Sequence, residues 1–184
     1  NNLYYNMEEC LTDIHKVLTD NNIEFFLVYG TLLGQHRDNC LIPHDTDIDL
    51  GIFSNNFSDD IKNCILKSEK FGNTYRRVGG PNESLEYTFH HINGSKVDIF
   101  FFYPVNKDIK DDYYYCASWF GICDTKKCGF CKWGNHIRGL KKINFKDKLF
   151  NVPVNTEEFL EESYGDDWRI PKKFDYYGGL SGGY

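Results

Sequence analysis

The sequence has no long apolar run and no excess of positive charge. No stretch approaches the ~18 consecutive apolar residues of a transmembrane helix, so we expect no membrane-spanning segment in this chain. Lysine and arginine together number 21, against 27 aspartate and glutamate residues, and the formal net charge is −6. This balance disfavours a general nucleic-acid-binding surface but is compatible with a local basic pocket.

No secretory signal is visible in the sequence, which starts at Asn1 rather than at a methionine. We expect this start to be a processing boundary, and an anchor upstream of it would be invisible. Both a cytoplasmic and a secretory-pathway location therefore stay open. Asn-x-Ser sequons at Asn56, Asn82 and Asn93 matter only in a secretory compartment, and a turn explains Asn93 better.

What the sequence does have is enough apolar and aromatic material for a folded core. Its 184 residues are 41% hydrophobic and 17% aromatic, which is typical of a globular protein rather than a disordered one. The length corresponds to one domain. We expect that domain to cover residues 1–177 and the glycine-rich residues 178–184 to be a flexible tail.

The most informative stretch is an acidic strand over residues 47–53. Its aspartates alternate with Ile48, Leu50 and Ile52. Successive side chains of a strand face opposite sides, so the carboxylates share one face while the aliphatic residues face a core. Carboxylates on one face repel each other, and a divalent cation such as Mg²⁺ or Mn²⁺ relieves that repulsion. The predicted ligands are Asp45, Asp47 and Asp49; the alternative is a solvated acidic loop, which the alternation disfavours.

A glycine-threonine turn precedes this strand. A first strand over residues 24–29 leads into Gly30 and Thr31. We expect Thr31 to cap a short helix over 32–36, so that backbone N–H groups at the helix start face a phosphate. The alternative is an ordinary strand-to-helix turn.

Together these segments resemble the LicD family of the nucleotidyltransferase superfamily. The resemblance lies in Tyr-Gly-Thr-Leu-Leu-Gly from Tyr29, then Arg37, then Ile-Pro-His-Asp-Thr-Asp-Ile-Asp ending at Asp49. His44 departs from the family, which usually has tryptophan there. A Tyr-Gly-x-x-Trp-x-x-Pro segment ending at Pro171 is also similar, so the resemblance extends over most of the chain.

That family includes bacterial phosphocholine transferases and the fukutin-type ribitol-phosphate transferases. The resemblance implies a metal-dependent enzyme that moves a phosphorylated small alcohol or sugar to a glycan hydroxyl. It implies a nucleoside-diphosphate-linked donor, with a CDP-linked donor favoured. The implied catalytic residues are Asp47, Asp49 and Asp98, and the implied donor-binding residues are Tyr29, Gly30, Thr31 and Arg37.

A β-hairpin is expected after the acidic strand. Its arms run over residues 85–92 and 96–103 and are joined by Asn93-Gly94, the strongest short-range signal for a hairpin. Asp98 lies in the almost wholly apolar second arm, where a carboxylate needs a partner. By resemblance, Asp98 completes the metal site or accepts the proton of the attacking hydroxyl. The alternative is a carboxylate held by backbone donors.

Cysteines are unusually dense in one segment. Four of the seven lie within sixteen residues: Cys116, Cys123, Cys128 and Cys131. Their spacing, which includes one Cys-x2-Cys, predicts a structural Zn²⁺ site. Disulfides or free thiols are the alternatives, and the redox compartment would decide between them.

Residues 132–148 are rich in lysine, arginine and histidine. A diphosphate donor needs cationic partners besides a metal, so we predict that His136 and Arg138 face it. The alternative is a solvated basic surface.

We therefore predict an α/β (α+β) fold: a nucleotidyltransferase-like small mixed sheet flanked by helices, with a cysteine-rich loop insertion. Helices are expected over residues 6–20 and 59–70 and from Thr156 to Tyr164. Two alternative functions remain. One is a nucleotidyltransferase that attaches the nucleotide itself, and the other is a non-catalytic, zinc-stabilised binding module.

Overall fold

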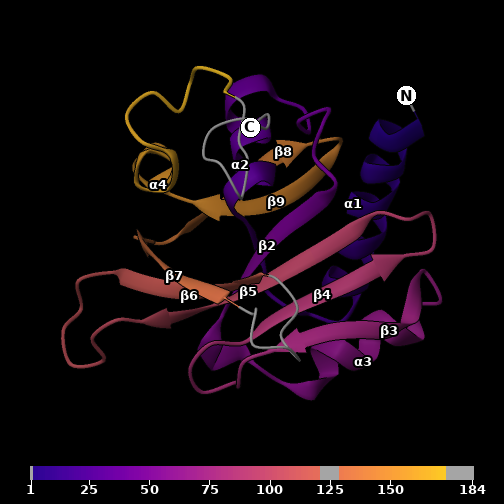
Figure 1. Cartoon of the computed structure of the whole chain (residues 1–184), viewed down its shortest axis with the longest axis horizontal. Coiled ribbons are helices and arrows are strands. Elements are labelled where there is room, and N and C mark those ends of the chain that lie inside the picture. The colour runs from indigo at the N-terminus through magenta and orange to yellow at the C-terminus, as the bar shows by residue number, and fades with distance from the viewer. Residues whose placement is uncertain (1, 121–128, 173–184) are drawn as a thin grey trace.

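A computed structural model of the chain describes residues 2–120 and 129–172 (Figure 1). The helices are α1 (Asn2–Asp20), α2 (Tyr29–Asp38), α3 (Asp59–Lys67) and α4 (Thr156–Tyr164), with a 3-10 turn η1 (Ser54–Asn56). The strands are β1 (Phe26–Leu27), β2 (Asp47–Phe53), β3 (Phe71–Val78), β4 (Glu86–His91), β5 (Lys96–Pro104), β6 (Tyr113–Phe120), β7 (Gly129–His136), β8 (Leu140–Phe145) and β9 (Lys148–Pro153). The predicted α/β class with a mixed sheet is confirmed.

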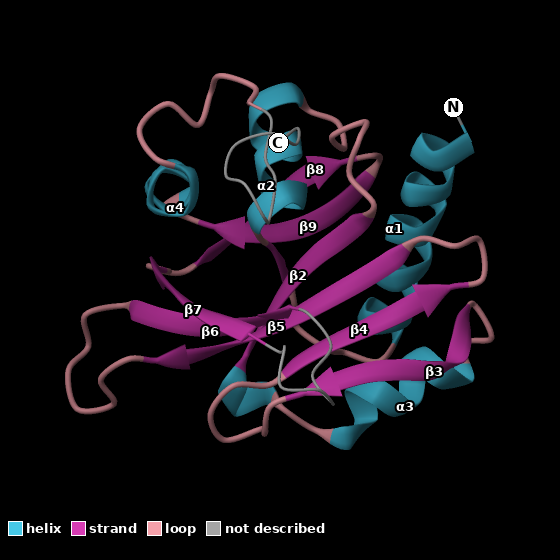
Figure 2. Cartoon of the chain, viewed as in Figure 1, coloured by secondary structure: helices cyan, strands magenta, loops and turns pink. Residues whose placement is uncertain are grey.

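Within residues 2–120 and 129–172 the sheet is open and has nine strands, seven of them in the order β3-β4-β5-β2-β1-β9-β8. The β6–β7 hairpin is attached to the end of β5 (Figure 2). The pairs β2–β5 and β1–β9 are parallel, and the other pairs are antiparallel. Strand β2 is therefore central, between β1 and β5.

Helices cover this sheet in two pairs. Helix α1 packs on α3 and contacts β2 and β5, whereas α2 packs on β2 and α4. The apolar face of α1, including Leu11, Ile14 and Leu18, is almost completely buried, as its spacing predicted. Among the described residues, no helix has the length and apolar character needed to cross a membrane.

Most of the expected elements form where the sequence places them. Strand β2 has the predicted bounds, and α3 begins after Ser58, whose hydroxyl accepts a hydrogen bond from the Asp60 N–H at 3.0 Å. Helix α3 ends at Lys67, three residues earlier than predicted. The hairpin is confirmed, and the Asn93 side chain accepts from the Ser95 N–H at 3.0 Å.

The strand predicted over residues 24–29 is too long. Strand β1 has only two residues because Tyr29 already belongs to α2. At its start, the Leu32 N–H donates to the Val28 carbonyl at 3.1 Å. The chain thus turns from sheet to helix within one residue, and Tyr29 takes a left-handed φ of 43°.

The cysteine-rich loop is not confirmed as an insertion. Cys116 and Cys131 lie on the two strands of the β6–β7 hairpin, which replaces much of the predicted loop. Cys116 is opposite Trp133 and Ser118 is opposite Cys131. Cys123, Cys128 and the predicted tail 178–184 lie outside the described residues.

Candidate active site

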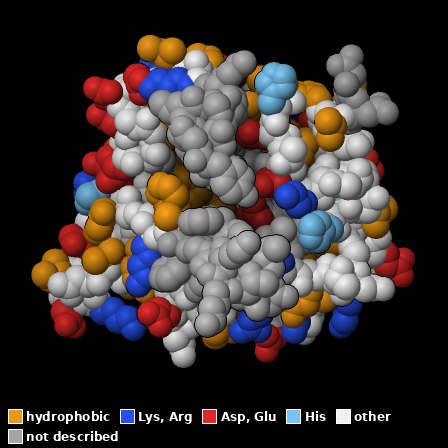
Figure 3. Space-filling view, in the orientation of Figure 1, with side chains coloured by type: hydrophobic (Ala, Val, Ile, Leu, Met, Phe, Trp, Pro, Cys, Tyr) orange, Lys and Arg blue, Asp and Glu red, His pale blue; other side chains and the backbone are white. Residues whose placement is uncertain are grey.

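The acidic residues predicted from two distant segments meet on β2 and β5. These strands are parallel, and Asp49 lies directly opposite Asp98, while Asp47 lies opposite Lys96. Opposite residues on adjacent strands share a face of the sheet, so the side chains of these four residues are neighbours. Figure 3 shows acidic side chains beside a basic one near the centre of this face.

The start of α2 holds Asp49 in place. The Gly30 N–H donates to Asp49 Oδ2 at 3.2 Å, and the Asp49 N–H donates to Thr31 Oγ1 at 2.8 Å. Positive charge at a helix N-terminus favours an anion there. The prediction that Thr31 caps the helix is therefore wrong: it lies inside α2, is buried, and anchors the backbone of β2.

Gly30 leaves room for two carboxylates. A Cβ atom at this position would lie 2.8 Å from Asp45 Oδ2 and 3.2 Å from Asp49 Oδ2. The first separation is shorter than a normal non-bonded contact. The absence of a side chain therefore lets Asp45, which precedes β2 in the chain, come close to the same helix start as Asp49.

Burial and mutual repulsion make these carboxyl groups hard to ionise. Burial raises the pKa of Asp49 well above its usual range, and the charges of Asp98, Asp47 and Asp45 raise it further. Burial and the charge of Asp47 raise the pKa of Asp98 to about 7. The pKa of Asp45 is also raised to about 7, by burial first and then by Asp47. A bound cation would favour the charged forms.

Two further residues complete the site, and neither was singled out from the sequence. Thr88 on β4 donates from Oγ1 to Asp98 Oδ1 at 2.6 Å. Lys96 Nζ lies 3.4 Å from Asp47 Oδ1. The sequence could have placed Lys96 on the same face as Asp98, because it precedes Asp98 by two residues on one strand. Thr88 could not be found in this way, since only the β4–β5 register places it opposite Asp98.

Arg37 lies near the site, and its contact with a donor phosphate remains a prediction. Its guanidinium charge opposes the rise in the pKa of Asp45. The side chain is only 8% exposed and forms an ion pair with Asp38, with Nε 3.0 Å from Oδ2. Arg37 thus places a largely buried positive charge near the acidic cluster.

The Tyr29 side chain extends away from the helix start toward the β6–β7 hairpin. Its hydroxyl lies 3.0 Å from Cys116 Sγ and donates to Asn135 Oδ1 at 3.1 Å. Asn135 in turn donates to Ser163 Oγ on α4 at 3.1 Å. Tyr29 thus links α2, the hairpin and α4, and its contact with a donor phosphate remains a prediction.

The predicted zinc ligands are only partly described. Cys116 is buried, and burial raises the pKa of its thiol to about 12. This does not favour the thiolate that binds Zn²⁺. Cys131 is exposed. Because Cys123 and Cys128 lie outside the described residues, the zinc site remains a prediction.

His136 and Arg138 contact α4. His136 Nδ1 lies 2.5 Å from Glu162 Oε2, and Arg138 donates through Nε and Nη2 to both oxygens of Glu158, at 2.8 and 3.0 Å. These pairs join the end of β7 to α4. Contact of either residue with a substrate remains a prediction.

Two other groups in the described part of the chain have three ligand atoms within 4.8 Å of one another: Glu9, Asp13 and His91, and His136, Glu158 and Glu162. Among the four aspartates of the acidic cluster, which are Asp45, Asp47, Asp49 and Asp98, no three have carboxylate oxygens that all lie within 4.8 Å of one another. In the first group, His91 Nδ1 accepts from the Asn93 N–H at 3.0 Å, so Nε2 carries the proton donated to Asp13 at 2.7 Å. This group is therefore a hydrogen-bonded contact between α1 and the hairpin.

Comparison with known proteins gives matches over most of the chain. Residues 22–155 match the family model described as LicD/FKTN/FKRP, nucleotidyltransferase domain. Ribitol-5-phosphate transferase FKTN of Mus musculus is 32% identical over 167 residues, which are 90% of this chain and 34% of that protein. The Homo sapiens protein of the same name gives the same identity and coverage. Ribitol 5-phosphate transferase FKRP of Mus musculus is 28% identical over 81% of this chain and 29% of that protein. The chain thus spans about a third of the length of these relatives.

Proposed function

The chain belongs to the LicD/FKTN/FKRP nucleotidyltransferase-domain family, and from this premise we propose that it is a metal-dependent phosphotransferase. Its reaction would move a phosphorylated small alcohol or sugar from a nucleoside-diphosphate-linked donor to a glycan hydroxyl. The observation that carries the proposal is the pairing of Asp49 with Asp98 on adjacent parallel strands, beside Asp47 and close to Asp45.

Ribitol phosphate is the transferred group that we favour. The names of the mammalian relatives support it, and those relatives match across nearly the whole chain. A CDP-linked donor remains the favoured choice among nucleoside diphosphates, as inferred from the sequence. Phosphocholine and sugar phosphates are the other groups that the family resemblance implies.

The chemistry of the acidic residues fits a divalent cation. Their ligand atoms are carboxylate oxygens, which Mg²⁺ and Mn²⁺ prefer. The raised pKa values of Asp45, Asp49 and Asp98 show that the protein's own groups do not fully stabilise the charged carboxylates, which a cation would do. Asp47, Asp49 and Asp98 would hold the cation with Asp45 nearby, although their oxygens are spread more widely than in the two compact groups. When bound, the cation would supply positive charge that stabilises the phosphate oxygens and the leaving nucleoside monophosphate.

The chemical step forms one P–O bond and breaks another. The oxygen of the acceptor hydroxyl attacks the phosphorus of the transferred phosphate, and the bond from that phosphorus to the nucleoside monophosphate breaks. The hydroxyl proton passes to a base, and the nucleoside monophosphate leaves with the bridging oxygen. Asp98 either completes the set of metal ligands or serves as this base, and in both roles the Thr88 hydroxyl fixes its orientation.

Cationic and N–H groups near the aspartates would position the donor. Lys96 and Arg37 supply two positive charges near the cluster, beside Asp47 and Asp45 respectively. The start of α2 adds backbone N–H groups. These contacts would orient the diphosphate so that the acceptor oxygen and the leaving oxygen lie on opposite sides of phosphorus.

A thermal-shift screen tests the proposal first. Nucleotides and nucleoside-diphosphate conjugates, CDP-ribitol among them, are each added with Mn²⁺, Mg²⁺ or EDTA. Binding to the native state raises the melting temperature by mass action. A rise with a cytidine diphosphate conjugate that disappears in EDTA supports the transferase.

Two other outcomes point elsewhere. If no nucleotide shifts the melting temperature but EDTA alone lowers it strongly, the metal is structural and a binding module replaces the enzyme. If turnover leaves the nucleoside monophosphate attached to the acceptor, the activity is nucleotidyl transfer. Mass spectrometry of the products separates these reactions, because they attack different phosphorus atoms.

A further inference from the structure

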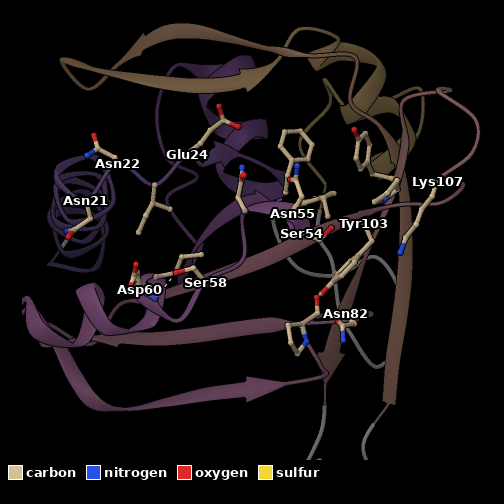
Figure 4. Close-up of a pocket in the computed structure, with 18 residues that line it drawn as sticks. Asn21, Asn22, Glu24, Ser54, Asn55, Ser58, Asp60, Asn82, Tyr103 and Lys107 are labelled. Carbon is tan, nitrogen blue, oxygen red and sulfur yellow. Dashed lines mark hydrogen bonds between the residues drawn. The ribbon is translucent and has the colours of Figure 1, made fainter.

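A polar groove of about 1000 Å³ lies at the opposite end of β2 from the aspartates (Figure 4). Its walls come from the turn after α1, the η1 turn, the loop around Asn82, the end of β5 and the start of β6. In Figure 4, Asn21, Asn22 and Glu24 lie on one side, and Asn82, Tyr103 and Lys107 on the other.

This groove is separate from the acidic cluster. Phe53 lines it, and Phe53 is four residues beyond Asp49 on β2, a distance of roughly 13 Å along an extended strand. The rings of Phe26 and Phe102 lie against Gly51, between Asp49 and Phe53 on β2, and Phe102 forms part of the groove wall. Both are fully buried, and their ring centroids are 5.4 Å apart. A ligand in the groove would not touch the aspartates through this layer.

Amide side chains dominate the polar lining. Asn22, Asn55 and Asn82 are exposed at the groove, and within the described ranges none of these three has a side-chain hydrogen bond. Each amide group offers two N–H donors and a carbonyl acceptor. An alcohol group both donates and accepts, so paired amides suit a ligand with several hydroxyl groups.

The charges at the groove disfavour a phosphorylated ligand. Glu24 and Asp60 carry negative charge there, and Lys107 is the only cation among the described lining residues. The formal net charge of these three side chains is −1. A phosphate or nucleotide would meet net repulsion. An apolar ligand would in turn leave the amides without partners. An uncharged, hydroxyl-rich ligand meets neither cost.

Two aromatic rings provide flat surfaces in the same groove. Phe53 and Tyr114 are half-buried, and their ring centroids are 5.2 Å apart. An aromatic face carries partial negative charge and attracts the weakly positive C–H groups on one side of a sugar ring. Amides and aromatic faces together match the two kinds of surface that a sugar presents.

The groove wall is held in shape without a ligand. The Tyr103 hydroxyl accepts from the Leu85 N–H at 3.0 Å and lies 3.0 Å from the Pro81 carbonyl oxygen. These bonds fix both ends of the loop that carries Asn82. A wall already ordered loses less conformational entropy on binding.

We propose that this groove binds an uncharged oligosaccharide, as a site distinct from the acidic cluster. The assignment comes from the lining of the groove. The proposed transferase adds only a reason for such a site, since an acceptor glycan could be held there away from its reacting end. Donor binding and saccharide binding are therefore tested separately.

Saturation-transfer NMR with protein made in bacteria tests the proposal. Bacterial protein carries no N-glycan on Asn56 or Asn82, whose sequons lie at the groove. Maltotriose, N-acetyllactosamine and a mannotriose are the uncharged probes, and a sialylated trisaccharide is the charged comparison. EDTA is present throughout, so that the acidic cluster plays no part. We expect saturation transfer to at least one uncharged probe and weaker transfer to the charged one.

Variants locate the binding site. Asn55→Ala combined with Asn82→Ala removes two exposed amides, and we expect binding to weaken at least tenfold with an unchanged melting temperature. Tyr114→Leu keeps an apolar contact for Phe53 but removes the flat ring, and we expect a similar loss. Asn73→Ala changes an exposed amide on β3, outside the groove, and should have no effect.

Two results would reject the proposed saccharide-binding groove. The proposal fails if no uncharged probe binds at millimolar concentration, or if binding is unaffected by both groove variants. Saccharide binding without a nucleotide-dependent thermal shift would reject the transferase but keep the groove. A nucleotide-dependent thermal shift without saccharide binding would support the transferase and reject the saccharide site in the groove.

Discussion

Asp49 and Asp98 lie opposite each other on the parallel strands β2 and β5, and each is held by a different neighbour. Asp49 accepts from the Gly30 N–H at the start of α2, and Asp98 accepts from the Thr88 hydroxyl on β4. The two side chains are therefore held by different elements, Asp49 by the start of α2 and Asp98 by the neighbouring strand β4. Burial and the charges of neighbouring aspartates raise the pKa of both carboxyl groups, and a bound cation would favour their charged forms.

Replacing Asp49 tests the acidic cluster directly. Asp49→Asn keeps an oxygen that can accept from the Gly30 N–H but removes the negative charge. We expect turnover to fall at least ~100-fold, as when a charge-stabilising group is lost. The free energy of unfolding should fall by less than about 1 kcal/mol or rise, because a repelled carboxylate is removed.

Turnover and urea denaturation measure the two effects of this change. Asp108→Asn is the control, since Asp108 is exposed in the loop after β5. Unchanged turnover in Asp49→Asn would reject the assignment of the site.

The hydroxyl of Thr88 should matter for rate more than for stability. Thr88→Val keeps the branched shape that suits a strand but loses the 2.6 Å hydrogen bond to Asp98. A hydrogen bond to a charged group is worth about 1.5–3 kcal/mol, so we expect kcat to fall roughly tenfold or more. Thr88→Ser restores the hydroxyl and should recover most of kcat. A serine variant as slow as the valine variant would show that packing, not the hydrogen bond, explains the loss.

Lys96 should act on donor binding. Lys96→Met keeps most of the side-chain length but removes the charge that lies 3.4 Å from Asp47. We expect the KM for the donor to rise about tenfold, in the range of a lost charge-assisted contact, with a smaller change in kcat. Steady-state kinetics measures both constants. Lys110→Met changes an exposed lysine outside the site and serves as the control; equal KM values in the two variants would contradict the assigned role.

The core beneath the site leaves no room for an added methyl group at Gly51. A Cβ there would lie 2.5 Å from an atom of the Phe26 ring and 2.9 Å from one of the Phe102 ring. Overpacking of this kind costs about 1–3 kcal/mol, so we expect the free energy of unfolding of Gly51→Ala, measured by urea denaturation, to fall by that amount. Gly80→Ala is the matched control, because no atom lies within 4 Å of its added Cβ. Equal stability of the two variants would show that the aromatic cluster adapts freely.

Local patterns were enough to predict the long elements. The apolar spacing of α1, the Ser58 cap of α3 and the Asn93-Gly94 turn act through neighbours in the chain, so each was readable from a short window. Strand β2 was equally clear, because its aspartates and aliphatic residues alternate. The short β1 was overestimated, since its end depends on a single left-handed residue, Tyr29.

Side-chain roles that depend on distant partners were harder to predict. The sequence predicted that Thr31 caps a helix, but its hydroxyl instead accepts a hydrogen bond from the Asp49 N–H on β2. Nothing in the sequence indicated that His136 and Arg138 contact glutamates on α4, because those partners are distant in the chain. Cys116 reads as part of a cysteine cluster, but its thiol is buried against Tyr29.

The sequence by itself determined the central acidic strand, the hairpin that carries Asp98 and the family. These depend on periodicity and on residues close together in the chain. Only the tertiary structure decided that Asp98 lies opposite Asp49, that Thr88 orients it and that Lys96 joins Asp47. The physical reason is that strand register is fixed by packing and hydrogen bonds over the whole sheet, and a shift of one residue would turn every one of these side chains to the other face.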